Sequence, residues 1–148
     1  MNEQSADNRA YDALLLDRQL CFPLYAAARK IVGAYTPVLK PLGLTYTQYL
    51  VMLVLWEKDG IGVGRLCARL RLDSGTLTPV LKKLEERSLL ERRRSGKDER
   101  VVILTLTDQG RALREQALGI PEEVGRCLSL TPEEAGILYN LLYRIIDE

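Results

Sequence analysis

Two short helical patterns separated by a turn, with a strand-rich segment after them, constrain the fold of this chain more than any other feature. Residues 63–70 place apolar side chains three or four positions apart, and residues 77–84 repeat that spacing. The turn Leu72-Asp73-Ser74-Gly75 between them contains helix-capping residues. A turn cluster at 95–98 and the β-branched run 100–106 predict a β-hairpin. Helix, turn, helix and hairpin in this order predict a winged helix-turn-helix, with Pro79 leaving the start of its second helix open by a turn.

Further helical patterns lie on both sides of this module. An apolar face runs from Leu16 to Tyr35, and we expect Pro37 and then Pro41-Leu42-Gly43 to end that helix. Thr45 and Gln48 form a capping box that opens an almost entirely apolar helix, which we expect in the core. After the hairpin, caps at Thr107-Asp108 and Thr131-Pro132-Glu133-Glu134 predict more helices, with a break near Gly119-Ile120-Pro121.

The 148 residues are therefore expected to form one domain (1–148) that is mainly α-helical with a small β-hairpin wing, an α+β fold. The winged helix-turn-helix occupies 46–107, and dimerisation helices at 10–45 and 108–148 flank it. Both flanks have strong apolar faces, and helices that flank a DNA module in a small protein usually pair with their copies in a second protomer, which favours a homodimer.

Charge is distributed unevenly along the chain. The formal net charge is only +1, which at first argues against a nucleic-acid partner. Between Arg65 and Arg100, however, eleven basic residues outnumber six acidic ones, so this segment carries +5 and the remainder −4. A basic module on an acidic body is typical of a protein that presents one face to phosphates, such as those of double-stranded DNA. A solvated surface of mixed charge is the alternative for such a run taken alone.

The expected geometry of the module assigns candidate DNA contacts. Ser74, Thr76 and Thr78 stand at the start of the second helix, where hydroxyl and backbone N–H groups can meet phosphates or base edges, although Ser74 can equally be a plain N-cap. Phosphate contacts suit Lys82 and Lys83, one turn further on. At the hairpin tip, Lys97 and Arg100 are placed for a minor groove, with Asp98 orienting the Arg100 guanidinium. A tip that merely keeps the hairpin soluble is the alternative.

Composition limits the chemistry. The chain has no histidine, which excludes the usual triads and histidine metal sites, so no cofactor or metal is expected. The longest apolar run, Tyr49–Trp56, is too short to cross a membrane, and no apolar leader follows the polar start. We therefore expect a cytoplasmic protein whose three cysteines are reduced thiols.

Several motifs together resemble a known family. The run Leu72–Leu84 with Asp98-Glu99-Arg100 resembles the MarR family of dimeric winged-helix repressors. More specifically, the chain resembles the organic hydroperoxide resistance regulators of that family, through Leu20-Cys21-Phe22, Leu24-Tyr25-Ala26, Tyr35 and Leu44-Thr45-Tyr46 with Gln48-Tyr49-Leu50. The resemblance covers about Leu16 to Leu106. It implies a repressor that releases its operator when an organic hydroperoxide oxidises a reactive cysteine.

The resemblance also assigns roles to particular residues. Cys21 matches the peroxide-reactive cysteine, and Cys127 resembles a C-terminal cysteine of the partner chain that resolves the sulfenic acid as a disulfide. Tyr35 and Tyr46, with Tyr25 as a further candidate, would donate O–H groups that stabilise the thiolate. The alternatives are that the tyrosines are ordinary half-buried aromatics, that Cys21 is structural, and that Cys127 is a spare exposed thiol. Cys67, on the inward face of its helix, is expected to be a buried small hydrophobe.

Spacing adds one constraint to this picture. Tyr35 follows Cys21 by 14 positions, which is about 21 Å along a continuous helix. If the contact implied by the resemblance holds, Tyr35, with Tyr46, must therefore reach Cys21 of the other chain. Two other functions stay open: a repressor released by a small phenolic or apolar ligand, and a thiol peroxidase.

Overall fold

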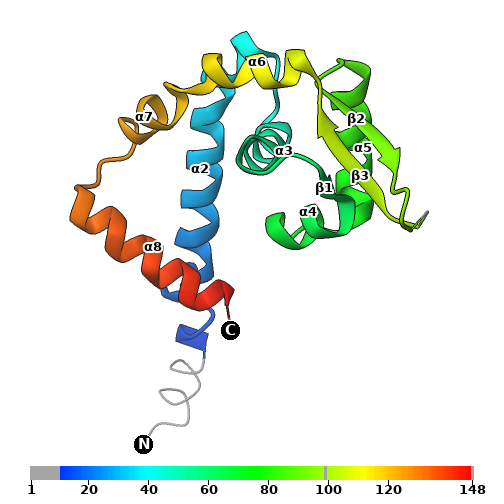
Figure 1. Ribbon diagram of the computed structural model, residues 1–148. Helices are drawn as coiled ribbons and strands as arrows, with labels where there is room; N and C mark the ends of the chain where they lie inside the picture. The colour runs from blue at the N-terminus through cyan, green and yellow to red at the C-terminus, as the bar shows by residue number, and fades with distance from the viewer. Residues whose placement is uncertain (1–10, 99, 148) are drawn as a thin grey trace, which may run out of the picture.

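The computed structural model describes residues 11–98 and 100–147, so the first ten residues, Glu99 of the hairpin tip and Glu148 lie outside the described part. The chain is mostly helical, with one small antiparallel sheet (Figure 1). Its elements in order are η1 (Leu16–Arg18), α2 (Cys21–Leu39), η2 (Lys40–Leu42), α3 (Tyr46–Glu57), β1 (Ile61–Gly62), α4 (Val63–Leu70), α5 (Ser74–Glu86), β2 (Leu90–Arg94), β3 (Val102–Leu106), α6 (Asp108–Ala117), α7 (Ile120–Gly125) and α8 (Pro132–Ile146). The predicted fold class, a winged helix-turn-helix with flanking helices, is confirmed.

The wing is a hairpin of β2 and β3 to which the structure adds a third strand. β3 is central, and its register pairs Leu90 with Leu106 and Arg94 with Val102. On its other side, the two-residue strand β1 pairs Ile61 with Leu104. The sequence pattern did not predict β1, because a strand of two residues has no periodicity to detect.

Helix α2 differs from its predicted bounds at both ends. It begins at Cys21 and not near Leu16, where a 3₁₀ turn stands instead. Pro37 does not end it, because the helix continues to Leu39, which is 1% exposed and whose burial offsets the hydrogen bond lost at the proline. The chain then turns at Gly43, whose φ of 64° is a left-handed conformation suited to glycine.

The core is built around α3. The predicted capping box is present, because Thr45 Oγ1 accepts from the backbone N–H of Gln48 while Gln48 Oε1 accepts from that of Thr45. Side chains on several faces of α3 are buried, as its all-apolar pattern predicts. Fully buried leucines from the surrounding elements pack around it: Leu39, Leu66, Leu77, Leu81, Leu84 and Leu104.

Helix α5 begins at Ser74, and its N-cap is Asp73, whose carboxylate accepts from the backbone N–H of Thr76 at 2.8 Å. The reading of Ser74 as the N-cap is therefore wrong. Pro79 lies in the second turn of α5 without ending it, which settles the boundary that the sequence left open. Buried Leu77, Leu81 and Leu84 anchor the helix on both sides of the proline.

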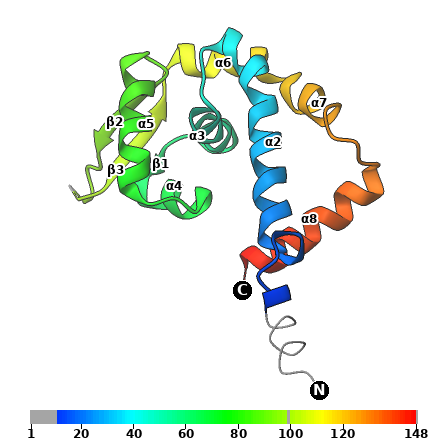
Figure 2. The same ribbon diagram turned by 180° about the vertical axis from the view of Figure 1, so that it is seen from behind.

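The flanking helices stand beside the winged helix, and α2 packs on α3. In both views α2 stands between the winged helix and α7, and α8 crosses the start of α2, so that the C-terminal end of α8 meets Arg71 (Figures 1 and 2). Helix α8 has no buried residue, although it carries the predicted apolar face. No single helix in residues 11–98 and 100–147 is long and apolar enough to cross a membrane, and only a pair bent by 72°, Cys21–Leu42 with Tyr46–Glu57, passes by length and composition.

Candidate functional site

The start of α5 presents the predicted hydroxyl groups at the surface. Ser74, Thr76 and Thr78 are all exposed. Local hydrogen bonds already occupy two of them, because Thr76 Oγ1 donates to Asp73 Oδ2 at 2.7 Å and Thr78 Oγ1 donates to the Ser74 carbonyl at 2.6 Å. These bonds orient the two hydroxyl oxygens, which can still accept a hydrogen bond. The hydrogen bonds from Thr76 also lower the pKa of Asp73, so the cap stays ionised.

A cleft of about 800 Å³ joins α5 to the wing and to α4. Three predicted contact residues line it together, namely Ser74, Thr78 and Arg100. Lys82 and Lys83 are exposed on α5 but do not line the cleft. The cleft is also lined by three cations that sequence reasoning did not assign as contacts, namely Lys58, Arg65 and Arg92. The charge count had included Arg65 and Arg92.

The wing tip is a closed turn. Ser95 N–H donates to the Val101 carbonyl at 2.8 Å, and Val101 N–H donates to that of Asp98 at 3.0 Å. Asp98 does not orient the Arg100 guanidinium as expected; in the described part of the chain its carboxylate accepts from the Arg100 backbone N–H at 3.0 Å. A carboxylate two residues before an N–H closes the local turn first, which explains the difference. Lys97 is exposed beside it, with its N–H donating to Ser95 Oγ.

Several cations of the basic segment form ion pairs or hydrogen bonds with other residues of the chain. Arg92 donates to Glu85 from Nε at 2.8 Å, and this hydrogen bonding holds the pKa of Glu85 below its ordinary value. Other ion pairs join Arg93 to Glu91, Lys82 to Glu86, Arg69 to Glu57 and Arg71 to Asp147. Arg87 donates to the Leu42 and Gly43 carbonyls and so holds the turn before α3. The charge count alone could not show which cations are already paired within the chain.

The cysteines occupy three different settings. Cys21 is exposed at the first residue of α2, and Cys127 is exposed just after α7, with its Sγ 3.6 Å from the Glu123 carbonyl. Pro23 is tolerated in the first turn of α2, where its missing N–H would have no helical partner. Cys67 packs against the core but is only partly buried, and it lines the cleft at the wing, so its predicted burial is confirmed only in part.

Two of the three predicted tyrosines lie together. The rings of Tyr35 and Tyr46 are 4.8 Å apart, and Tyr49, which sequence reasoning did not assign to the site, joins them at 5.7 Å from Tyr35. Burial raises the pKa of Tyr35, and burial followed by the neighbouring phenols raises that of Tyr46 and Tyr49. All three therefore remain protonated at neutral pH and can donate an O–H.

Tyr25 and Cys21 are not part of this tyrosine cluster. Tyr25 is exposed and pairs with Arg29, whose Nη1 donates to its oxygen at 3.4 Å and whose guanidinium lies 5.5 Å from the ring centre. Cys21 and Tyr35 share one continuous helix, so they are about 21 Å apart along its axis. Within one chain, the cysteine and the tyrosine cluster cannot touch.

Known proteins resemble this chain over nearly its whole length. A family model described as transcriptional regulator SarA/Rot matches residues 34–116. The organic hydroperoxide resistance transcriptional regulator of Bacillus subtilis is 41% identical over 137 residues, which cover 93% of each chain. The regulator TtmR of Methylorubrum extorquens is 46% identical over 137 residues, 93% of this chain and 70% of that protein.

Solved structures agree with this assignment. A structure of reduced AbfR bound to DNA, a protein of Staphylococcus epidermidis, is 35% identical with a TM-score of 0.76 and covers 95% of this chain and 97% of that one. A disulfide-formed structure of AbfR is 36% identical with a TM-score of 0.64, covering 95% and 98%. Because the curated relatives are regulators, the chain is a transcriptional regulator and not a thiol peroxidase. With its winged helix and these relatives, the chain belongs to the SarA/Rot family of MarR-like winged-helix transcriptional regulators.

Proposed function

We propose that the protein is a dimeric repressor that binds operator DNA and releases it when an organic hydroperoxide oxidises Cys21. The observation that carries this proposal is the exposed Cys21 thiol at the first residue of α2. The N-terminal end of a helix favours an anionic side chain, and exposure gives a peroxide access. The printed names of the relatives, a hydroperoxide resistance regulator and a disulfide-formed AbfR, support the same chemistry.

The dimer is part of the proposal, because α8 leaves its apolar face exposed. Ile137, Leu141 and Ile145 are each 48% exposed or more, and α2 exposes Phe22 and Val32 as well. Apolar surface of this extent on two neighbouring helices indicates a partner surface. A second copy, with its α2 antiparallel to the first, would bring Tyr35 and Tyr46 of the partner subunit toward Cys21.

DNA would be held by the start of α5 and by the wing. Ser74, Thr76 and Thr78 would meet phosphates or base edges in the major groove, with Lys82 and Lys83 on the backbone. Lys97 and Arg100 would approach the minor groove from the wing tip, whose turn Asp98 closes. In a dimer, the two α5 helices must lie about 34 Å apart to enter successive major grooves.

Oxidation proceeds in two balanced steps. The Cys21 thiolate attacks the terminal oxygen of the hydroperoxide and the O–O bond breaks, which leaves a sulfenic acid on Cys21. The departing alkoxide takes up the proton that the thiol released on ionisation and leaves as the alcohol. The thiol of Cys127 of the partner subunit then attacks the sulfenic sulfur, forming the disulfide and releasing water. A disulfide requires Cα atoms within about 7 Å, so closing it would move α7 and change the spacing of the α5 helices.

A gel-shift on the promoter of a neighbouring gene tests the proposal, before and after cumene hydroperoxide and after reductant. We expect the wild type to release DNA on oxidation and to rebind on reduction. Cys21→Ser should bind DNA and ignore the peroxide, whereas the matched control Cys67→Ser should respond like the wild type. Cys127→Ser should oxidise without forming the inter-chain disulfide on a non-reducing gel. DNA binding by the wild type that is indifferent to peroxide would refute the sensor.

A ligand-released repressor is the second candidate. The supporting observation is an apolar cavity of about 350 Å³ between the start of α2 and α8, lined by Leu20, Leu24, Leu138, Leu141, Leu142, Arg144 and Ile145. A small apolar ligand bound there would release DNA equally from the wild type and from Cys21→Ser, which separates the two functions.

A further inference from the structure

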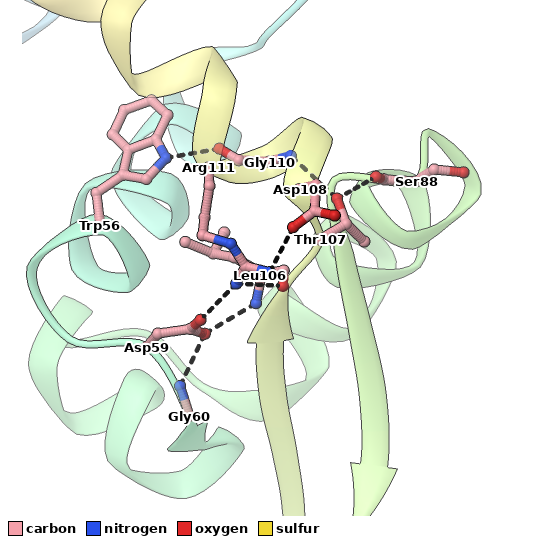
Figure 3. A network of polar contacts seen from close by, with 9 residues as sticks. All are labelled: Trp56, Asp59, Gly60, Ser88, Leu106, Thr107, Asp108, Gly110 and Arg111. Atoms are coloured by element: carbon pink, nitrogen blue, oxygen red, sulfur yellow. Dashed lines mark hydrogen bonds and ion pairs between the residues drawn. The ribbon is translucent and has the colours of Figure 1, made fainter.

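The base of the wing is held by a polar network that the proposed oxidation chemistry does not use (Figure 3). Asp59 lies in the turn between α3 and β1. Its Oδ1 accepts from the Gly60 N–H and from the Leu106 N–H, both at 2.8 Å. Leu106 is the last residue of β3, so one carboxylate joins the end of α3 to the base of the wing hairpin.

Arg111, on the second turn of α6, completes the arrangement. Its Nη1 donates to Asp59 Oδ2 at 3.1 Å and to the Leu106 carbonyl at 2.9 Å. Its Nη2 donates to Asp108 Oδ1 at 2.9 Å. Both backbone polar groups of Leu106 are therefore bound by the Asp59–Arg111 pair.

The sheet register explains why this pair stands at this position. Ile61 on β1 pairs with Leu104 on β3, so an antiparallel continuation would place Asp59 opposite Leu106. Instead of a further strand residue, a carboxylate accepts the Leu106 N–H and a guanidinium donates to its carbonyl. The pair thus continues the ladder with side chains and attaches α6 to it.

Neighbouring bonds join the same region to the rest of the winged helix. Trp56 Nε1 on α3 donates to the Gly110 carbonyl at 2.9 Å, and Thr107 Oγ1 donates to the Ser88 carbonyl at 2.6 Å. The end of α3, the turn before β2, the end of β3 and the start of α6 therefore meet at one place, as Figure 3 shows. The chain continues from α6 through α7, which packs on α2, to Cys127.

We propose that Asp59 and Arg111 are positioning residues that set the wing against α5, so that α5 and the wing tip can contact one DNA duplex together. This inference rests on the DNA binding proposed above. Neither residue need touch DNA, because the pair acts through the base of the hairpin. The side chains are 35% and 52% exposed, so the pair contributes little to the free energy of unfolding. Its effect on DNA binding can therefore be separated from an effect on folding.

Two substitutions break the pair in different ways. Arg111→Gln removes the guanidinium that binds both Asp59 and the Leu106 carbonyl. Asp59→Asn keeps an oxygen for the Leu106 and Gly60 N–H groups but loses the charge that pairs with Arg111. Arg114→Gln, three residues further along α6, removes the same positive charge without touching the pair and serves as the control.

The test is a double-mutant cycle between Arg111 and the wing tip. Operator affinity is measured for the wild type, Arg111→Gln, Arg100→Ala and the double variant, with thermal unfolding measured for each. We expect Arg111→Gln to weaken DNA binding about tenfold while the unfolding temperature stays close to that of the wild type. In the Arg100→Ala background, Arg111→Gln should weaken DNA binding by less than about threefold, because the wing tip has already lost the DNA contact of Arg100. Asp59→Asn should give a smaller loss than Arg111→Gln.

The outcomes that overturn the proposal are distinct. If the fold-losses in DNA affinity of the two single variants multiply in the double variant, the pair does not act through the wing. The same conclusion follows if Arg111→Gln and Arg114→Gln bind DNA with equal affinity. Loss of DNA binding together with a large fall in unfolding temperature would assign the pair a purely structural role. A wild type that binds no operator fragment would refute the proposed function itself, and with it this role of the pair.

Discussion

Gly110→Ala is the substitution that most directly tests how closely α6 approaches the wing. A Cβ at Gly110 would lie 1.9 Å from the Leu89 carbonyl oxygen and 3.2 Å from Leu106 Cδ2. The first contact is with backbone, which cannot turn aside as a side chain does. Gly110 also donates its N–H to Thr107 Oγ1 at 3.0 Å and accepts from Trp56. Any shift of α6 that relieves the clash therefore strains these two bonds.

The expected magnitude combines three terms. Alanine within a helix is favoured over glycine by up to about 1 kcal/mol. Overpacking a filled site costs about 1–3 kcal/mol, and weakening two hydrogen bonds adds about 1 kcal/mol each. The balance is a loss of about 2–4 kcal/mol in the free energy of unfolding. For a chain of this size, the unfolding temperature should fall by roughly 5–15 °C.

Thermal unfolding followed by circular dichroism measures this change. All samples need the same protein concentration, because the stability of a dimer depends on it. Gly64→Ala is the matched control: it lies in the first turn of α4, where a Cβ would meet nothing within 4 Å. We expect the control to unfold at or slightly above the wild-type temperature. If Gly110→Ala unfolds at the same temperature as the control, the close contact between α6 and Leu89 is refuted.

Three further predictions concern DNA, peroxide and pH. Lys83→Ala should weaken binding to all DNA sequences alike and reduce the slope of log affinity against log salt by about 1, measured by titration at several salt concentrations; an unchanged slope would show that Lys83 faces no phosphate. Tyr35→Phe should slow oxidation of Cys21 by cumene hydroperoxide in stopped-flow measurements, because the thiolate would lose an O–H donor; an unchanged rate would exclude the tyrosine as a donor. Asp73 has a lowered pKa, so its ionised cap contributes stability above the ordinary pKa of an aspartate, and that contribution is lost as pH falls through the lowered value. Thermal unfolding at about pH 7 and about pH 3 should therefore show a smaller acid-induced loss in Asp73→Asn than in the wild type, and equal losses would contradict the assignment.

Local chemistry explains which parts of the fold could be predicted from the sequence. The capping boxes at Thr45 and Thr131 and the turn before α5 depend on residues within four positions of one another, and the structure confirms them. The passage of α2 through Pro37 could not be predicted in this way, because it depends on the burial of Leu39 against distant elements. Strand β1 was missed for the same reason, since only its pairing with β3 defines it.

In the candidate site, too, some residues could be placed from local sequence and others only from their tertiary neighbours. Ser74, Thr78 and Arg100 were predicted as contacts from their places on a helix start and a hairpin tip, and they do line one cleft. Which arginines are engaged in ion pairs depended on tertiary neighbours, as Arg71 with Asp147 illustrates. Tyr49 was missed because an aromatic side chain in an apolar helix looks like ordinary core until its ring is found beside Tyr35.

The length of α2 has a genetic consequence. Since Cys21 and Tyr35 stand at distant points of one rigid helix, each reactive centre of the proposed dimer draws its cysteine from one chain and its tyrosine from the other. In a mixed dimer with Cys21→Ser in one chain and Tyr35→Phe in the other, both substituted side chains would lie in one centre. The second centre would keep the wild-type cysteine and the wild-type tyrosine. Two defective alleles would then complement each other in one cell, which two copies of either allele alone could not do.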